Sequence, residues 1–354
     1  MPWYRSLYQY FGRYFFETEV GAFWAIVNCM VASFWLGVGL IYVFKPWGLT
    51  NWHRNVVKNK RRLREQHFRR LAEELNVDDD DVIEKRRRIV DLDFHELRAQ
   101  LQSGRLSAVE VVEAYRWKAL AVQDKCNCVT EFVREAMDEA RQLDQTYASA
   151  DTTKPPLFGL PFSVKDNFFM KGYDSCRGLG KECEQHKDVE CSLVTHLKLL
   201  GAVPIVRTNV PQLLLAFVCS NPVYGTTGNP YDTKRTPGGS SGGEGALIAA
   251  GGAAFGIGSD LLGSLRIPAH FCGLTTLKTT SGRLKVTDAH TGVPGTSRLG
   301  LGYGFFTRDT AAQSFLFEQL LQDAYFRKVP ATVPLPFAAN ANNGGAERFP
   351  LKIG

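Results

Sequence analysis

Residues 237–248 read Pro-Gly-Gly-Ser-Ser-Gly-Gly-Glu-Gly-Ala-Leu-Ile, and residues 256–268 read Gly-Ile-Gly-Ser-Asp-Leu-Leu-Gly-Ser-Leu-Arg-Ile-Pro. A flexible glycine-serine linker is disfavoured, because residues typical of a buried core follow these glycines at once, over 246–250. A phosphate-binding loop needs a lysine after its glycines, and a dinucleotide site needs a third glycine where Leu261 stands. The stretch therefore fits neither class of nucleotide-binding site.

The same stretch satisfies the pattern G-x-S-x-G around Ser240, which is typical of the nucleophile of α/β-hydrolases. That mechanism needs an acid and then a histidine further along the chain. His270 and His290 are the only later histidines, and neither stands in a distinctive motif. Because so short a pattern is common by chance, the α/β-hydrolase remains an alternative at this stage.

The surrounding sequence alternates helical patterns with short apolar runs. Asp93 and Ser107 each precede a glutamate by three residues, a spacing that predicts capped helix starts. A third amphipathic stretch covers residues 129–147, and short apolar runs that predict strands follow at 162–164 and 202–206. Helices that alternate with short strands indicate an α/β layered architecture.

Taken together, the glycine-serine stretch and the residues 264–268 and 271–273 after it resemble the amidase signature family. The resemblance includes Leu-Pro-Phe-Ser-Val-Lys-Asp at 160–166 and covers about residues 91–354. Residues 208–212, 219–222 and 332–337 are similar to one branch, fatty-acid amide hydrolase. The resemblance implies an α/β fold in which helices surround a mixed twisted sheet. Since family members have longer chains, the fold is expected to be incomplete at its C-terminal end.

By this resemblance Ser264 is the nucleophile, Ser240 the bridging serine and Lys165 the base, and no cofactor or metal takes part. A base must be neutral, and the lysine reference pKa of ~10.4 falls toward neutrality only if burial penalises the ammonium form. The preceding apolar run at 162–164 predicts such burial, whereas Asp166 opposes it if its side chain points inward. The oxyanion is expected to bind the backbone N–H groups of Leu261, Leu262, Gly263 and Ser264.

Two positions bear on activity and specificity. Leu262 stands where the family has a glycine, and a leucine that needed φ > 0 there would cost ~1–3 kcal/mol or block the site. The run 213–217, which includes Leu214, lies where the fatty-acid amide branch lines its acyl pocket. A core helix explains the same apolar run equally well, so both interpretations stay open.

The N-terminal part of the chain has a separate character. After an N-terminal segment, 1–19, residues 20–44 carry no charge and predict a transmembrane helix. The linker at 45–90 is expected to be a solvated helical segment, and residues 45–70 within it have a net charge of +8 in a chain of net charge +6. This distribution excludes a basic nucleic-acid binder. It predicts a single-pass anchor, in the endoplasmic reticulum or another endomembrane, with the body at 91–354 facing the cytosol.

The sequence therefore predicts a membrane-anchored serine hydrolase that cleaves fatty-acid amides to free fatty acid and amine. A truncated homologue with impaired or no activity, acting as a membrane-tethered lipid-binding or regulatory partner, is the alternative. The last residues, 351–354, resemble the start of a family strand. A chain that stops inside a strand leaves unpaired edges and an exposed core, and this is the reason for the alternative. Homodimerisation is left open.

Overall fold

The computed structural model describes residues 19–149, 151–290 and 300–337, without the side chains of 19–25 and 41–50. The residues fall into two compact units, 1–55 and 56–354, which are described separately. Residues 351–354, where the sequence predicts a strand, lie outside the described part.

The sequence predicts a transmembrane helix over residues 20–44, and these residues belong to the long helix α2 (Glu19–Leu75). The membrane span itself is not supported, because no helix in the described residues has a stretch that is both long and apolar enough to cross a bilayer.

A mixed sheet forms the centre of the unit 56–354, and its strands run in the order β1-β3-β2-β6-β8-β7. Strand β2 pairs in parallel with β3 and β6, while the other pairings are antiparallel. The strand bounds are β1 Val129–Phe132, β2 Pro161–Lys165, β3 Val203–Thr208, β6 Phe255–Asp260, β7 Thr275–Thr276 and β8 Gly302–Thr307. A separate small ribbon pairs β4 (Ser220–Asn221) with β5 (Gly225–Thr226). This is the mixed sheet that the resemblance to the amidase signature family implies.

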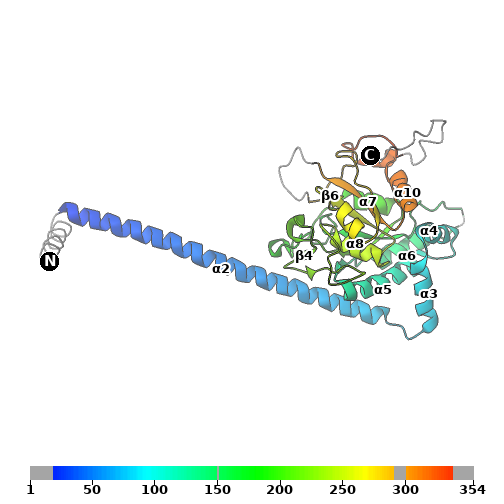
Figure 1. The fold of residues 1–354 in the computed structure, drawn as a ribbon, viewed down its shortest axis with the longest axis horizontal. Coiled ribbons are helices and arrows are strands. Elements are labelled where there is room, and N and C mark those ends of the chain that lie inside the picture. Colours follow the sequence, from blue (N-terminus) through cyan, green and yellow to red (C-terminus); the bar gives the residue numbers. More distant parts are fainter. Residues whose placement is uncertain (1–18, 150, 291–299, 338–354) are drawn as a thin grey trace, which may run out of the picture. The chain divides into compact units, whose positions relative to one another are not determined.

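Helices surround this sheet (Figure 1). They are α3 Asp80–Asp91, α4 Phe94–Ser103, α5 Ala108–Cys126, α6 Ala136–Thr146, α7 Ser192–Leu199, α8 Gly242–Ala249, α9 Arg266–Phe271, α10 Thr310–Leu320 and α11 Asp323–Lys328, with single 3₁₀ turns at Gly180–Glu182 and Gln212–Leu214. Both predicted caps are confirmed: Asp93 accepts a hydrogen bond from the Glu96 N–H, and Ser107 and Glu110 form a capping box. The single helix predicted for 129–147 is wrong, since β1 occupies its first four residues.

Both faces of the central strands are buried, but they carry different residues. Phe162 of β2 stacks on Phe255 of β6 with ring centroids 5.4 Å apart, and Phe305 of β8 continues this aromatic row. Because side chains alternate along a strand, Ser163 and Lys165 leave β2 on the face opposite Phe162. The sheet therefore has an aromatic face and, between β2 and α8, a buried polar face.

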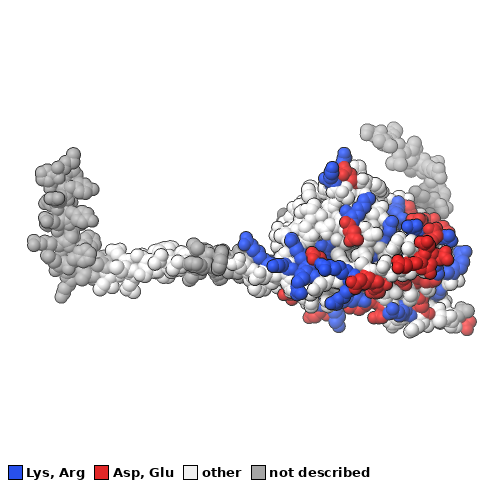
Figure 2. Space-filling view, turned by 90° about the horizontal axis from the view of Figure 1, so that it is seen from below, with Lys and Arg blue, Asp and Glu red and all other residues white. Residues whose placement is uncertain are grey.

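The last part of α2 packs on the body, although the sequence predicts a solvated linker there. Lys60 is buried, and its Nζ lies 2.9 Å from Asp174 Oδ2 and 3.3 Å from Glu131 Oε2. Arg61 donates to the carbonyl oxygens of Pro222 and Val223, each at 2.7 Å. Two of the basic residues in the segment 45–70 are thus used in intramolecular contacts. On the face seen in Figure 2, acidic and basic side chains are interspersed over the body.

Candidate active site

Lys165 lies at the carboxyl end of β2, where it is completely buried. Its Nζ is 2.9 Å from Ser240 Oγ, 3.0 Å from Ser259 Oγ and 3.3 Å from the Ser259 carbonyl oxygen. Burial lowers the pKa of Lys165 to about 7, against the opposing effect of the nearby carboxylates of Asp260 and Glu244. A lysine with this pKa is neutral in a large fraction of molecules at pH 7, so it can accept a proton from Ser240.

The two serine-bearing segments are held next to each other. Ser240 lies just before α8, after a cis Gly239–Ser240 peptide bond, and Ser264 lies on the turn between β6 and α9. The Ser241 N–H donates to the Ser264 carbonyl oxygen at 3.3 Å. The structure therefore brings Lys165 and Ser240 into hydrogen bonding and places Ser264 beside them. No hydrogen bond joins the Ser264 hydroxyl to Ser240 within the described part of the chain.

Asp260 organises the turn that carries Ser264. Its carboxylate accepts hydrogen bonds from the Gly263 N–H at 2.7 Å and the Leu265 N–H at 3.1 Å, and Arg266 Nε lies 3.0 Å from it. Burial opposes ionisation of Asp260, but these donors hold its pKa below the usual value. Since the Gly263 N–H already donates to Asp260, it is not free to bind an oxyanion, contrary to the prediction of four available donors.

The concern about strain at Leu262 is wrong. The left-handed backbone of this turn is at Gly263, with φ of +120°, whereas Leu262 is not among the residues with positive φ. The Leu262 side chain is 66% exposed. Leucine at this position therefore needs no unfavourable backbone conformation.

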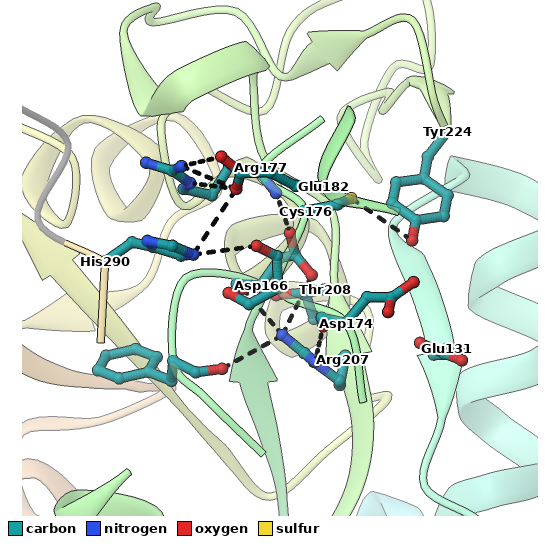
Figure 3. Close-up of polar contacts among 12 residues, drawn as sticks. Glu131, Asp166, Asp174, Cys176, Arg177, Glu182, Arg207, Thr208, Tyr224 and His290 are labelled. Carbon is teal, nitrogen blue, oxygen red and sulfur yellow. Dashed lines mark hydrogen bonds and ion pairs between the residues drawn. The ribbon is translucent and has the colours of Figure 1, made fainter. Parts of the chain in front are cut away.

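Asp166 does not point toward Lys165. Its carboxylate accepts from Arg207 Nη2 at 3.1 Å and from the Arg177 N–H at 2.7 Å, and Arg207 also donates to the carbonyl oxygens of Asp166 and Phe168 (Figure 3). Burial raises the pKa of Asp166 to about 6, although the charge of Arg207 opposes this rise. Asp166 thus belongs to a buried ion-pair cluster beside the Lys165 site, and it is not among the groups that shift the pKa of Lys165.

The predicted acyl-pocket run 213–217 is not a core helix. Leu213 and Leu214 lie in a 3₁₀ turn with positive φ angles of 57° and 64°, and the Leu214 side chain is buried. Phe217 is 52% exposed. The run lies against the Ser240 turn, because a Cβ added to Gly239 would fall 2.5 Å from the Ala216 carbonyl oxygen.

Neither histidine of the α/β-hydrolase alternative contacts Ser240. His290 Nε2 lies 3.1 Å from the Ser175 carbonyl oxygen and 3.7 Å from Glu182, in the cluster of Figure 3. Burial lowers the pKa of His290 to about 4. His270 is exposed on α9. Ser240 has Lys165 as its hydrogen-bond partner, and this excludes a histidine base for it.

Comparison with known proteins agrees with this geometry. The family model described as Amidase matches residues 110–354. The chain belongs to the amidase family. The matched range includes Lys165, Ser240 and Ser264.

Among curated proteins, the chain is 44% identical over 231 residues to fatty acid amide hydrolase 1 of Caenorhabditis elegans, covering 65% of this chain and 40% of that protein. It is 39% identical over 263 residues to fatty-acid amide hydrolase 1 of Sus scrofa, covering 74% of this chain and 44% of that protein. A solved fatty acid amide hydrolase has a TM-score of 0.75 and 25% identity, covering 82% and 55% of the two chains. The chain spans about half the length of these relatives.

Sequence reasoning missed two groups near the buried Lys165. Ser259 and Glu244 both stand in the quoted motifs, but they were given no role there. The alternation of β2 places Ser163 and Lys165 on one face, and that pattern is the signal that could have indicated a polar environment for Lys165. The tertiary position of α8 over this face is not visible in the sequence.

Proposed function

We propose that this chain is a serine amidase that uses Lys165, Ser240 and Ser264, and that its substrates are fatty-acid amides. The observation that carries the proposal is the completely buried Lys165 Nζ, 2.9 Å from Ser240 Oγ. A buried lysine without a carboxylate in hydrogen-bonding contact is costly to keep protonated, and general-base catalysis is a use for such a residue.

The chemistry follows from these positions. Neutral Lys165 accepts the Ser240 hydroxyl proton while Ser240 accepts the proton of Ser264. The Ser264 oxygen then attacks the amide carbonyl, and the resulting oxyanion binds the N–H groups of Leu261, Leu262 and Ser264. The same protons, moving in reverse, protonate the departing amine and leave an acyl-enzyme. Water hydrolyses that ester and regenerates Ser264.

The relay requires the Ser264 hydroxyl to come within hydrogen-bond distance of Ser240. The hydrogen bond from the Ser241 N–H to the Ser264 carbonyl oxygen joins the two turns, and catalytic hydrogen bonds are often long before substrate binds. Ser264 is 8% exposed, which leaves a surface through which an acyl group can reach it.

The acyl preference is proposed from the apolar side chains of the run beside Ser240. Leu215 and Phe217 of this run, with Val218 just after it, are 60%, 52% and 50% exposed, and a long acyl chain would remove such a surface from water at ~25 cal/mol per Å². The similarity to fatty-acid amide hydrolases supports this substrate class. Equal kcat/KM values for oleamide and for a short acyl amide would contradict it.

The decisive test is covalent labelling of the purified, folded chain by a fluorophosphonate. Labelling that disappears in Ser264→Ala and in Lys165→Ala is expected. A folded wild type that fails to react favours the second candidate, a non-catalytic lipid-binding partner. That candidate is supported by two observations: the Gly263 N–H donates to Asp260, and the Ser264 hydroxyl has no hydrogen bond to Ser240 in the described residues.

A further inference from the structure

Glu244 is a completely buried carboxyl group in the first turn of α8, four residues after Ser240. The mechanism above gives it no part. Its Oε2 accepts a hydrogen bond from Ser163 Oγ at 2.5 Å, and its Oε1 accepts one from Thr208 Oγ1 at 2.6 Å. A buried carboxyl group loses its hydration, so the two hydroxyl donors that replace the lost water indicate that its position is specific.

Both donors belong to the sheet face that carries Lys165. Ser163 precedes Lys165 by two residues in β2, and Thr208 is the register partner of Lys165 in β3. Strand β6 makes room for the carboxyl group at Gly256, because a Cβ added to this glycine would overlap Glu244 Oε2. Glycine at 256 is therefore explained by the carboxyl group that lies over it.

The titratable groups around Lys165 differ in how firmly their charge state is fixed near neutral pH. Asp260 is held ionised by the backbone N–H groups of its turn and by Arg266. Burial raises the pKa of the Cys219 thiol to about 11, so it remains neutral at physiological pH. Burial raises the pKa of Glu244 to about 7, against its two hydrogen bonds. Glu244 is thus the group facing Lys165 whose charge changes near neutral pH.

We propose, on the basis of the function proposed above, that Glu244 is a positioning residue that sets the protonation state of Lys165. When the carboxyl group is protonated, Lys165 loses a neighbouring anion and is more readily neutral. When the carboxylate is charged, it favours the ammonium form, which cannot accept the Ser240 proton. The two buried groups therefore titrate as a pair, and the pair controls how much of the enzyme is active at a given pH.

The test is the rate of fluorophosphonate labelling of Ser264 as a function of pH, from about pH 5 to about pH 10, in wild type and in Glu244→Gln. Glutamine keeps the shape but carries no charge. The rising limb of the variant is expected to shift to lower pH by about one unit and to follow a single ionisation. A folded Glu244→Gln whose rising limb coincides with that of the wild type overturns the proposal.

Thr208→Val decides the question if Glu244→Gln does not fold. It removes one donor and leaves the carboxyl group, so the charged form of Glu244 loses stabilisation and the limb shifts in the same direction by a smaller amount. Glu190→Gln is the matched control, because its carboxylate faces Lys198 of α7, and its limb is expected to coincide with the wild-type limb. A wild type that does not label at all refutes the proposed function, whereas wild-type labelling with unshifted variants refutes only the role of Glu244.

Discussion

Lys165 and Asp166 are adjacent in the chain, yet their side chains belong to separate buried networks. Lys165 donates to Ser240 and Ser259 on the polar face below α8, whereas Asp166 pairs with Arg207 at 3.1 Å. Adjacent residues of an extended segment point to opposite sides, so a lysine base and a carboxylate can be neighbours without forming an ion pair. This separation lets burial lower the pKa of Lys165.

Replacement of Lys165 by methionine is expected to abolish labelling and to change the pH dependence of stability. The folded pKa of about 7 lies below the unfolded value of ~10.4, so the unfolded chain binds more protons between these values and wild-type stability rises with pH there. Lys165→Met removes this dependence. The free energy of unfolding of this variant is expected to exceed that of wild type by on the order of 3–5 kcal/mol near pH 7, and the difference is expected to vanish above about pH 10.5. Urea unfolding of both proteins near pH 7 and above about pH 10.5 measures this difference. A difference in unfolding free energy that does not depend on pH would contradict a neutral buried lysine.

Replacement of Arg207 by methionine tests the neighbouring network. Arg207 is completely buried, and it donates to the carbonyl oxygens of Asp166 and Phe168 as well as to the Asp166 carboxylate. Removing one partner of a buried ion pair typically costs ~3–5 kcal/mol. We expect a loss of this size in urea unfolding, while the pH limb of labelling stays unchanged because Asp166 does not act on Lys165. A shifted limb would show that the two networks are coupled.

The α2 contacts give a third prediction. Lys60 is 6% exposed and pairs with Asp174 and Glu131, so Lys60→Met leaves two carboxylates without their cation. A loss of ~3 kcal/mol or more is expected in thermal or urea unfolding of the whole chain. Lys58→Met is the control, since Lys58 is exposed on the same helix and its replacement is expected to change stability by less than ~0.5 kcal/mol. Equal effects of the two changes would mean that α2 does not pack on the body in solution.

The sequence predicts the parts of this site that depend on local pattern. Capped helices at Asp93 and Ser107 follow from spacing, and the burial of Lys165 follows from the apolar run before it. The mixed sheet follows from the resemblance to the amidase signature family. The environment of Lys165 does not, because Glu244 and Ser259 reach it from α8 and β6 through tertiary packing. The burial of Lys60 was missed for the same reason. A run of basic residues is normally solvated, and only the position of Asp174 in the folded chain reveals the ion pair.

The turn before Ser264 gives the last prediction, through a pair of substitutions with opposite expectations. Leu262 is exposed and has no positive φ, so Leu262→Gly is expected to leave the labelling rate within about threefold of wild type. Gly263 has a φ of +120°, and an added Cβ would lie 2.6 Å from Ile267 Cδ1. Gly263→Ala is therefore expected to cost ~1–3 kcal/mol in stability and to slow labelling at least tenfold, since the strained turn carries the nucleophile. Labelling rates and urea unfolding of both variants measure these effects. A large gain in labelling in Leu262→Gly would instead identify the leucine as a block to the active site.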